Sequence, residues 1–303
     1  MGMFTVRHSF GSNNRLTMLR FSLVSLLFLA HTLTVSAQSF GKLVRQYPGI
    51  VSYTFRDEFA KDVPATLDHI RQLGITDLEL SNLFGKTAPE FRTWLDGRGI
   101  KCSSYGVSYD DIQKKPAEVL QNAKTLGVQF VRVAWIPHEG AFDTTMVRKA
   151  AAVFNTFGQQ ARQQGITFCY HNHGYEFAPY GTAASTAGTL YDELMRLTNP
   201  DFVSFEMDIA WTFLPGQNPA TLLAKYPNRF RLMHLKDIRK GVPGNDQGKL
   251  ANENSVVLGT GQLDWPAILK AVNKSGIVHL YIEDESQAAA QQVPQSIAYL
   301  KGL

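Results

Sequence analysis

Three short segments in the C-terminal half of the chain contain residues that commonly bind divalent metal ions. They are FEMDIAW with Asp208, LMHLKD with His234 and LYIEDE with Glu283. Each residue lies at the downstream end of a β-branched or aromatic run, which is typical of a strand. A carboxylate, an imidazole and a second carboxylate at the ends of successive strands form a mixed oxygen and nitrogen ligand set. The pattern predicts a catalytic divalent-metal site.

A fourth cluster, YHNHGYEF, ends the strand-like run before these three segments and contains His171, His173 and Glu176. Glu176 is the expected fourth ligand, because a second carboxylate lets one group act as base and another as acid. His171 or His173 is the alternative ligand. The residues that do not bind the metal are expected to transfer protons, since histidine titrates near neutral pH.

Each of the three strand-end ligands also has a purely structural explanation. Asp208 could cap a helix, His234 could be a hydrogen-bonded core histidine, and Glu283 could pair with Lys236. Their coincidence at equivalent places on consecutive strands argues against three separate structural roles. Only six histidines follow residue 37, and three of them, His171, His173 and His234, lie in the four clusters described above.

Further residues are candidates for substrate contact or catalysis. Tyr53, Trp135 and Trp211 lie at strand ends, where aromatic rings commonly form the floor of a sugar site; core packing is the alternative. Glu79 is a candidate hydrogen-bond partner for the substrate or an ordinary residue of the barrel interior. Lys236 is a candidate contact for a substrate oxygen, with a salt bridge at the rim as the alternative.

The elements that must position these residues alternate regularly. Eight strand candidates are separated by amphipathic helices such as 64–73, 116–126, 147–164 and 266–274. The strand candidates lie within 49–55, 73–80, 98–105, 126–135, 164–173, 203–211, 230–238 and 275–284. Such alternation requires a parallel sheet, and eight units predict a single α/β domain, a closed (β/α)8 TIM barrel over residues 38–303. The polar faces of the last four strands are expected to point to the barrel axis, with Tyr170, Met207, Leu235 and Ile282 against the helices.

The first 37 residues are expected to be a signal peptide rather than part of the fold. Arg20 precedes an apolar run, and Val35-Ser36-Ala37 is a small-x-small cleavage site; Met18 is a possible true start. Export to the periplasm or the extracellular space follows, with no stable membrane span after cleavage. Removing three arginines lowers the formal charge from +4 to +1, which argues against a nucleic-acid partner.

The spacing and motifs resemble the xylose-isomerase-like barrel superfamily of sugar isomerases and epimerases, from SYTF through GTGQLDW to IEDE. The resemblance implies one divalent ion (Mn, Co, Mg or Zn) held by Asp208, His234 and Glu283 and by a residue of strand five. It departs from the ketose epimerases there, where a direct alignment puts His171 in place of the family's glutamate. Barrels of this family often dimerise, so a homodimer stays open.

The expected activity is removal of the proton α to the carbonyl of a sugar, keto-sugar or glycoside, through a metal-stabilised enediolate. Glu283, His171 or His173 is the expected base. Return of the proton gives isomerisation or epimerisation, whereas loss of a β-substituent gives an inosose-type dehydratase or a 3-keto-glycoside lyase or hydrolase. A non-catalytic sugar-binding barrel and a DNA-repair nuclease are the remaining alternatives, and the nuclease lacks the additional histidine and acidic ligands that it needs.

Overall fold

The computed structural model describes residues 1–2, 40–180, 188–245 and 249–303. The chain separates into two units, Met1–Gln38 and Ser39–Leu303. The expected signal peptide, 1–37, lies outside the described residues apart from the first two and stays a prediction. Within the described ranges, no helix is long and apolar enough to cross a membrane.

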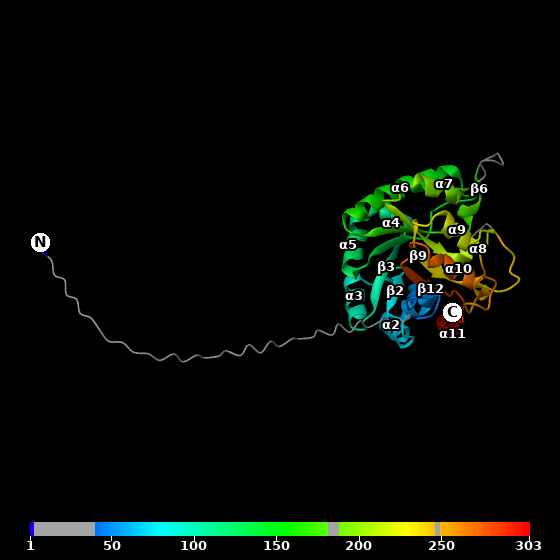
Figure 1. Ribbon diagram of the computed structural model, residues 1–303, viewed down its shortest axis with the longest axis horizontal. Coiled ribbons are helices and arrows are strands. Elements are labelled where there is room, and N and C mark those ends of the chain that lie inside the picture. The colour runs from blue at the N-terminus through cyan, green and yellow to red at the C-terminus, as the bar shows by residue number, and fades with distance from the viewer. Residues whose placement is uncertain (3–39, 181–187, 246–248) are drawn as a thin grey trace, which may run out of the picture. The chain divides into compact units, whose positions relative to one another are not determined.

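Eight parallel strands close into a barrel within the unit Ser39–Leu303 (Figure 1). They are β1 (Gly49–Val51), β2 (Asp77–Leu80), β3 (Lys101–Val107), β4 (Phe130–Val133), β5 (Thr167–His171), β8 (Val203–Asp208), β9 (Phe230–Leu235) and β12 (His279–Ile282). The first strand pairs with both β2 and β12, which closes the ring. The predicted (β/α)8 barrel is confirmed. Seven of the eight strands lie within their predicted ranges, and β3 continues two residues beyond its range, to Val107.

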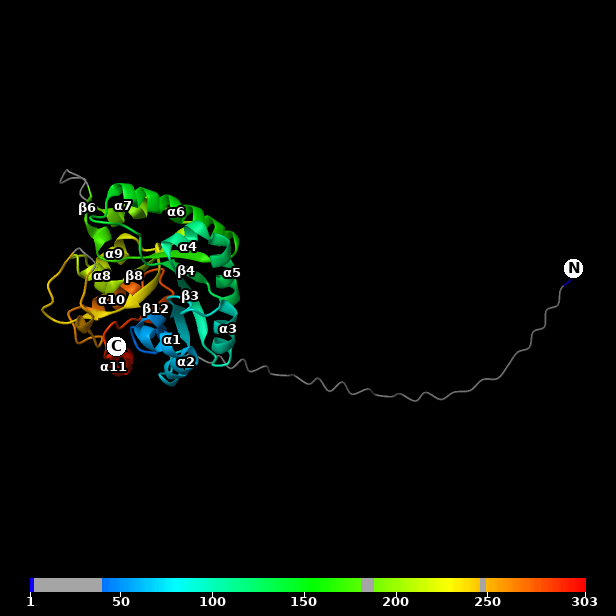
Figure 2. The same cartoon turned by 180° about the vertical axis from the view of Figure 1, so that it is seen from behind.

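Helices lie between the strands and surround the barrel in both views (Figures 1 and 2). They are α1 (Arg56–Lys61), α2 (Val63–Gln72), α3 (Ala88–Asp96), α4 (Tyr109–Lys114), α5 (Pro116–Leu126), α6 (Thr144–Gln163), α7 (Leu190–Leu197), α8 (Ile209–Phe213), α9 (Pro219–Lys225), α10 (Trp265–Val272) and α11 (Ala289–Gly302). Local sequence sets their ends. Thr87 and Glu90 form a capping box at the start of α3, and Gly127 ends α5 with a φ of 70°, a conformation that glycine adopts without strain.

Short elements complete the loops at the carboxyl ends of the strands. They are the 3-10 helices η1 (Ser52–Phe55), η2 (Tyr175–Phe177) and η3 (Asn252–Asn254), and the two-stranded sheets β6 (Pro179–Tyr180) with β7 (Gly188–Thr189) and β10 (Asp237–Ile238) with β11 (Ser255–Val256). Active sites of (β/α)8 barrels lie at this end. The loops therefore form the walls of any site there.

The pleat of the strands divides the side chains as predicted. Tyr170, Met207, Leu235 and Ile282 are buried in the apolar core that the helices cover. Tyr170, for example, packs against Phe154 of α6 with ring centroids 5.0 Å apart. Between these positions, His171 and Glu206 turn inward and meet, with Nδ1 and Oε2 3.0 Å apart.

An apolar layer fills the barrel as a cluster separate from the main core. Its members come from four strands, and they are Phe130, Cys169, Leu232 and Tyr281. Packed layers of this kind are the usual filling of a (β/α)8 barrel. The inward-facing polar residues follow these members by two positions along β4, β5, β9 and β12, and therefore lie nearer the carboxyl ends of the strands.

One buried carboxylate organises the long connection after β9. The side chain of Asp237 accepts hydrogen bonds from the backbone N–H groups of Gly259 and Gly261, at 2.9 and 3.1 Å, and from the indole N–H of Trp265 at 2.9 Å. A Cβ atom on Gly261 would lie 2.1 Å from Asp237 Oδ1, so only glycine fits there without a shift. These contacts fix the GTGQLDW segment that leads into α10.

Candidate metal centre and active site

Asp208, His234 and Glu283 meet at the carboxyl ends of three consecutive barrel strands. His234 Nδ1 lies 3.0 Å from Glu283 Oε2 and 4.0 Å from Asp208 Oδ2. One potential ligand atom from each residue lies within 4.8 Å of the other two, and all three side chains are buried. The strand register supports this arrangement, since Asp208 and His234 are direct neighbours between β8 and β9.

The two carboxylate oxygens of Asp208 have different surroundings. Oδ1 accepts hydrogen bonds from the backbone N–H groups of Ala210 and Trp211, at 2.8 and 2.9 Å, and so caps α8. Oδ2 is buried and has no hydrogen-bond partner among the described residues. Burial raises the pKa of Asp208 to about 7, with a further contribution from the neighbouring Glu283 and against the opposing effect of Lys236. The capping role and a ligand role are therefore compatible.

The charges around the three residues match a divalent cation. Three carboxyl groups, those of Asp208, Glu283 and Glu285, face the single ammonium group of Lys236, so acidic groups outnumber the lysine here. Isolated buried carboxylates are unfavourable unless a cation pairs with them. The donors are two carboxylate oxygens and one imidazole nitrogen, a set that suits Zn²⁺ and related ions and leaves positions open for substrate or water. The residues therefore fit the metal that the resemblance implies.

Lys236 is fully buried beside the ligand group and makes a short ion pair with Glu285. Its ammonium group also lies 3.5 Å from Glu283 Oε2 and 4.7 Å from the centre of the Trp211 ring. The surrounding carboxylates outweigh burial and raise the pKa of Lys236 well above its ordinary value. These contacts correspond to the salt bridge at the rim. A cavity of about 700 Å³ opens at this end of the barrel, and Lys236 is not among the described residues that line it. The structure therefore does not place Lys236 in direct contact with a substrate there.

Glu79 lies in the barrel interior rather than at the substrate cavity. Its Oε1 atom is 2.8 Å from His234 Nε2 and 2.6 Å from a terminal guanidinium nitrogen of Arg132. Glu79 is fully buried, so the expected contact with substrate does not match its position. An acceptor on Nε2 holds the proton there and leaves Nδ1 as the nitrogen that faces Asp208 and Glu283.

The interior network contains two residues that the sequence interpretation did not assign to the site. Arg132 pairs with Glu79 and, at 3.3 Å, with Glu206. Glu206 also forms a second possible ligand group with His171 and His234. The signal for Arg132 was a charged residue inside the apolar run of β4, and the signal for Glu206 was its position two residues before Asp208 on the same face.

Glu176, the expected fourth ligand, belongs to neither ligand group that the described residues form. Its carboxylate accepts hydrogen bonds from the Tyr170 hydroxyl and from the backbone N–H of His173, the latter at 2.9 Å. Because Tyr170 points toward the helices, this contact draws the glutamate away from the barrel axis. Burial raises the pKa of Glu176 to about 7.

His173 is the imidazole of YHNHGYEF that is best placed for proton transfer. It lines the cavity, and its Nδ1 atom is buried without a hydrogen-bond partner in the described part of the chain. Burial, followed by the charge of Lys236, lowers the pKa of His173 to about 3, so the ring is neutral at pH 7. The ring stacks on Trp211 with centroids 5.6 Å apart. His171 also lines the cavity but is hydrogen-bonded to Glu206.

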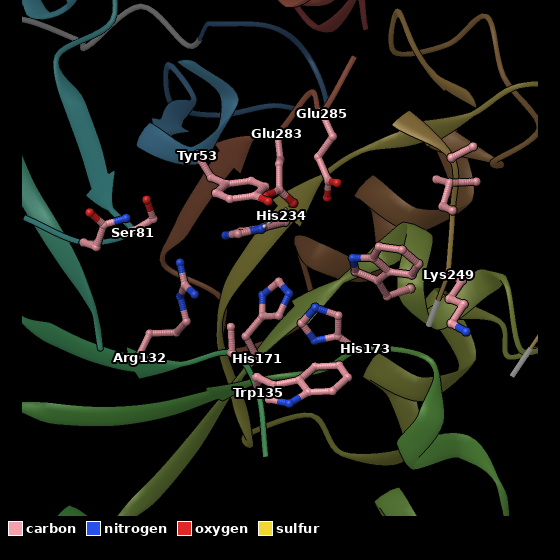
Figure 3. Close-up of a pocket in the computed structure, with 15 residues that line it drawn as sticks. Tyr53, Ser81, Arg132, Trp135, His171, His173, His234, Lys249, Glu283 and Glu285 are labelled. Carbon is pink, nitrogen blue, oxygen red and sulfur yellow. Dashed lines mark hydrogen bonds and ion pairs between the residues drawn. The ribbon is translucent and has the colours of Figure 1, made fainter. Parts of the chain in front are cut away.

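The cavity above these groups has a volume of about 700 Å³, a size typical of small-molecule sites. Figure 3 shows Tyr53 and Trp135 on opposite sides of the imidazole rings of His171, His173 and His234. The two aromatic side chains are 41% and 44% exposed, so their ring faces are available to a ligand. Trp211 also lines the cavity but is buried. Residues 249–251, from the connection after β9, line it as well.

A closed (β/α)8 barrel with a buried carboxylate and histidine group at its catalytic end belongs to a class in which sugar-converting enzymes are common. The family described as xylose isomerase-like TIM barrel matches residues 67–303. The chain therefore belongs to this family, as its motifs indicated.

Several curated relatives are similar over most of the chain. It is 25% identical to an inosose dehydratase of Lacticaseibacillus casei over 267 residues, which covers 78% of this chain and 87% of the relative. An inosose dehydratase of Geobacillus kaustophilus is 26% identical over 212 residues, covering 60% and 67%.

Solved structures share the fold at lower identity. A sugar phosphate isomerase/epimerase from Parabacteroides distasonis superposes with a TM-score of 0.69 at 23% identity, covering 84% of this chain and 93% of that one. The IOLI protein, crystallised with a bound zinc atom, gives a TM-score of 0.67 at 16% identity, with 84% and 96% covered.

Proposed function

We propose that this protein is a divalent-metal-dependent enzyme that removes the proton α to the carbonyl of a keto-sugar. One observation carries the proposal: Asp208 Oδ2, buried and unpartnered, lies beside His234 Nδ1 and Glu283. Family membership and the inosose dehydratase relatives support an enzyme of the sugar isomerase and dehydratase type. The IOLI protein, which has a similar fold, was crystallised with a bound zinc atom, and this supports a metal-dependent enzyme.

Asp208, His234 and Glu283 would hold the ion. When bound, it would act as a Lewis acid that polarises the substrate carbonyl and acidifies the neighbouring C–H. Glu79 would orient the imidazole of His234 from the opposite side by accepting the Nε2 proton. These residues supply binding and orientation, and the base comes from a different strand.

His173 is the proposed base. Its neutral ring and unpartnered Nδ1 are available to accept the α proton, and the electron pair of the broken C–H bond moves toward the carbonyl. Tyr53 would bind an apolar face of the sugar ring and exclude water from the reacting carbon. Return of the proton to the other face or to the neighbouring carbon completes an epimerisation or isomerisation.

Elimination is the second candidate, and two observations favour it. The curated relatives are dehydratases, and strand five presents imidazoles at the cavity instead of the carboxylate of an epimerase. In this outcome the C–O bond at the β-carbon breaks, and the departing oxygen takes the proton delivered by an imidazolium. The same residues then give a dehydratase or a glycoside lyase.

We further propose that the substrate is unphosphorylated and that residues 38–303 act after export. The support is the signal-like segment before residue 38. Phosphorylated sugars are mainly cytoplasmic, so an exported enzyme would encounter free keto-sugars or glycosides. The oligomeric state stays a prediction.

Proton exchange in D₂O tests the central proposal. Metal-loaded protein is incubated with keto-sugars and 3-keto-glycosides, and deuterium uptake at the α carbon is followed by NMR. We expect uptake that a chelator abolishes and that Asp208→Asn reduces at least 100-fold, because asparagine retains the cap of α8 but weakens the ligand set. No exchange and no cleavage across the panel would refute the proposal, and the products otherwise separate epimerase from lyase.

A further inference from the structure

A second cavity, of about 720 Å³, adjoins the one that contains the candidate metal group. The loops after β2, β3 and β4 form its walls. Five residues line both cavities, and they are Ser81, Asn82, Arg132, Ala134 and Trp135. A ligand held at the metal group could therefore extend into the second space without crossing a closed wall.

Trp135 is the aromatic wall that the two cavities share, and the protein holds its ring rigidly. The indole stacks on His138 with centroids 4.8 Å apart and an interplanar angle of 20°, and it meets the edge of Tyr175 at 4.8 Å. The Tyr175 hydroxyl in turn accepts a hydrogen bond from the backbone N–H of Ile136. His138 and Tyr175 therefore hold the indole ring in place, while 44% of Trp135 stays exposed. Such a ring is a preorganised surface for a second ring with an apolar face.

The charges of the second cavity favour a neutral occupant. Arg132, the one cation among the described residues that line it, is already paired with Glu79 and Glu206. Asp110 pairs with Lys114, and Asp111 accepts hydrogen bonds from Ser108 at the start of α4. No cation in this part of the described chain is left to bind a phosphate or carboxylate. The remaining lining carries no charge. It combines the apolar or aromatic residues Leu83, Tyr105, Val107, Tyr109 and Pro137 with the polar residues Ser81, Asn82 and Ser108.

We infer that the second cavity is a subsite for a second, neutral ring that is linked to the keto-sugar. The substrate class is then a glycoside whose other ring is a sugar or an aryl group, rather than a free monosaccharide. This inference rests on the proposed function, because it places the reacting ring at the metal group. It adds a binding site on the loops after β2, β3 and β4 that the proposed chemistry alone does not require.

Binding measurements on the metal-loaded protein test the subsite. The probes are the 3-keto forms of methyl glucoside, with one ring, and of phenyl glucoside and a glucosyl disaccharide, with two rings. We expect both or one of the two-ring probes to bind at least tenfold more tightly than the one-ring probe in isothermal titration calorimetry. Which of them gains affinity distinguishes an aryl group from a second sugar.

Two substitutions test whether the higher affinity for two-ring probes comes from the second cavity. Val107→Trp fills the second cavity, and Trp135→Ala removes the platform; each is expected to reduce the preference for two rings to threefold or less. Val278→Trp makes the same change as Val107→Trp at an exposed position outside both cavities and is expected to keep the preference. If Val107→Trp does not fold, Trp135→Ala, at a largely exposed site, carries the test.

The outcomes separate the subsite from the proposed reaction. Equal affinity for one-ring and two-ring probes, no measurable binding of either, or a preference that survives both substitutions would overturn the subsite. Deuterium uptake into all three probes is measured in parallel. Uptake without a two-ring preference refutes the subsite and leaves the proposed function intact, whereas a preference without uptake refutes the function and supports the subsite.

Discussion

Replacement of Glu176 by glutamine tests whether this residue is a metal ligand or a buried structural acid. The carboxylate is fully buried, and its pKa is raised from 4.5 to about 7. Because the folded chain binds this proton more tightly than the unfolded chain, the stabilising contribution is complete below about pH 4.5. It is lost as the pH rises through 7. At 1.36 kcal/mol per pKa unit, the loss amounts to about 3 kcal/mol.

Glutamine has nearly the same shape but cannot ionise, so it escapes this loss. We expect the stability that Glu176→Gln gains over the unmodified protein to be about 2.5 kcal/mol larger at pH 8 than at pH 5. Urea unfolding at several pH values measures the difference, and Glu118→Gln on the exposed surface of α5 is the control. We also expect unchanged metal affinity in Glu176→Gln. A difference that does not vary with pH would refute the burial argument, and a tenfold weaker metal affinity would restore Glu176 as a ligand.

Three further predictions concern the ligand group and the loop that supports it. Glu79→Ala should weaken metal binding about 10- to 100-fold, and ¹⁵N NMR should show loss of the Nε2–H tautomer of His234. Glu79→Gln should keep the tautomer. Unchanged metal affinity in Glu79→Ala would contradict the orienting role. The metal dissociation constant should rise up to tenfold per pH unit below 7, because the ion must displace the proton of Asp208, and calorimetry in which binding releases no proton would exclude this. Gly261→Ala should lower the free energy of unfolding by about 2 kcal/mol or more, because the new Cβ would clash with Asp237 Oδ1; thermal melting measures the change. Gly302→Ala is the control, since no described atom would lie within 4 Å of its Cβ.

The fold and the positions of the three candidate ligands at the strand ends could be predicted because they depend on local patterns. Alternation along a strand determines which side chains face inward, so the positions of Asp208, His234 and Tyr170 followed from the sequence alone. The parallel alternation of strands and helices then required that these ends meet at one rim. The order of the strands around the barrel follows the order along the chain, so the ligands on β8, β9 and β12 are neighbours.

The positions of Glu176 and Glu79 could not be predicted because each depends on partners distant in sequence or on a local irregularity. Glu176 follows the end of β5, where the strand alternation stops and η2 turns the carboxylate toward Tyr170. Glu79 and Arg132 are separated by 53 residues, and neither sequence segment indicates the other. An alternating pattern shows which face a residue occupies but not how deep in the barrel it lies, and depth distinguishes a substrate contact from a support of the metal ligand.

Glu79 and Arg132, which lie deeper in the barrel than the candidate ligand group, influence the protonation of His234. His234 lies between carboxylates on both sides, with Glu283 at Nδ1 and Glu79 at Nε2. Without a cation, both nitrogens attract protons, and these carboxylates raise the pKa of His234 well above its ordinary value despite burial. A divalent ion at Nδ1 would replace one of those protons, while Arg132 keeps Glu79 ionised and the other proton on Nε2. The interior arginine would therefore stabilise the form of the histidine that a metal ion requires, although it lies on the opposite side of that ring from the candidate ligand oxygens.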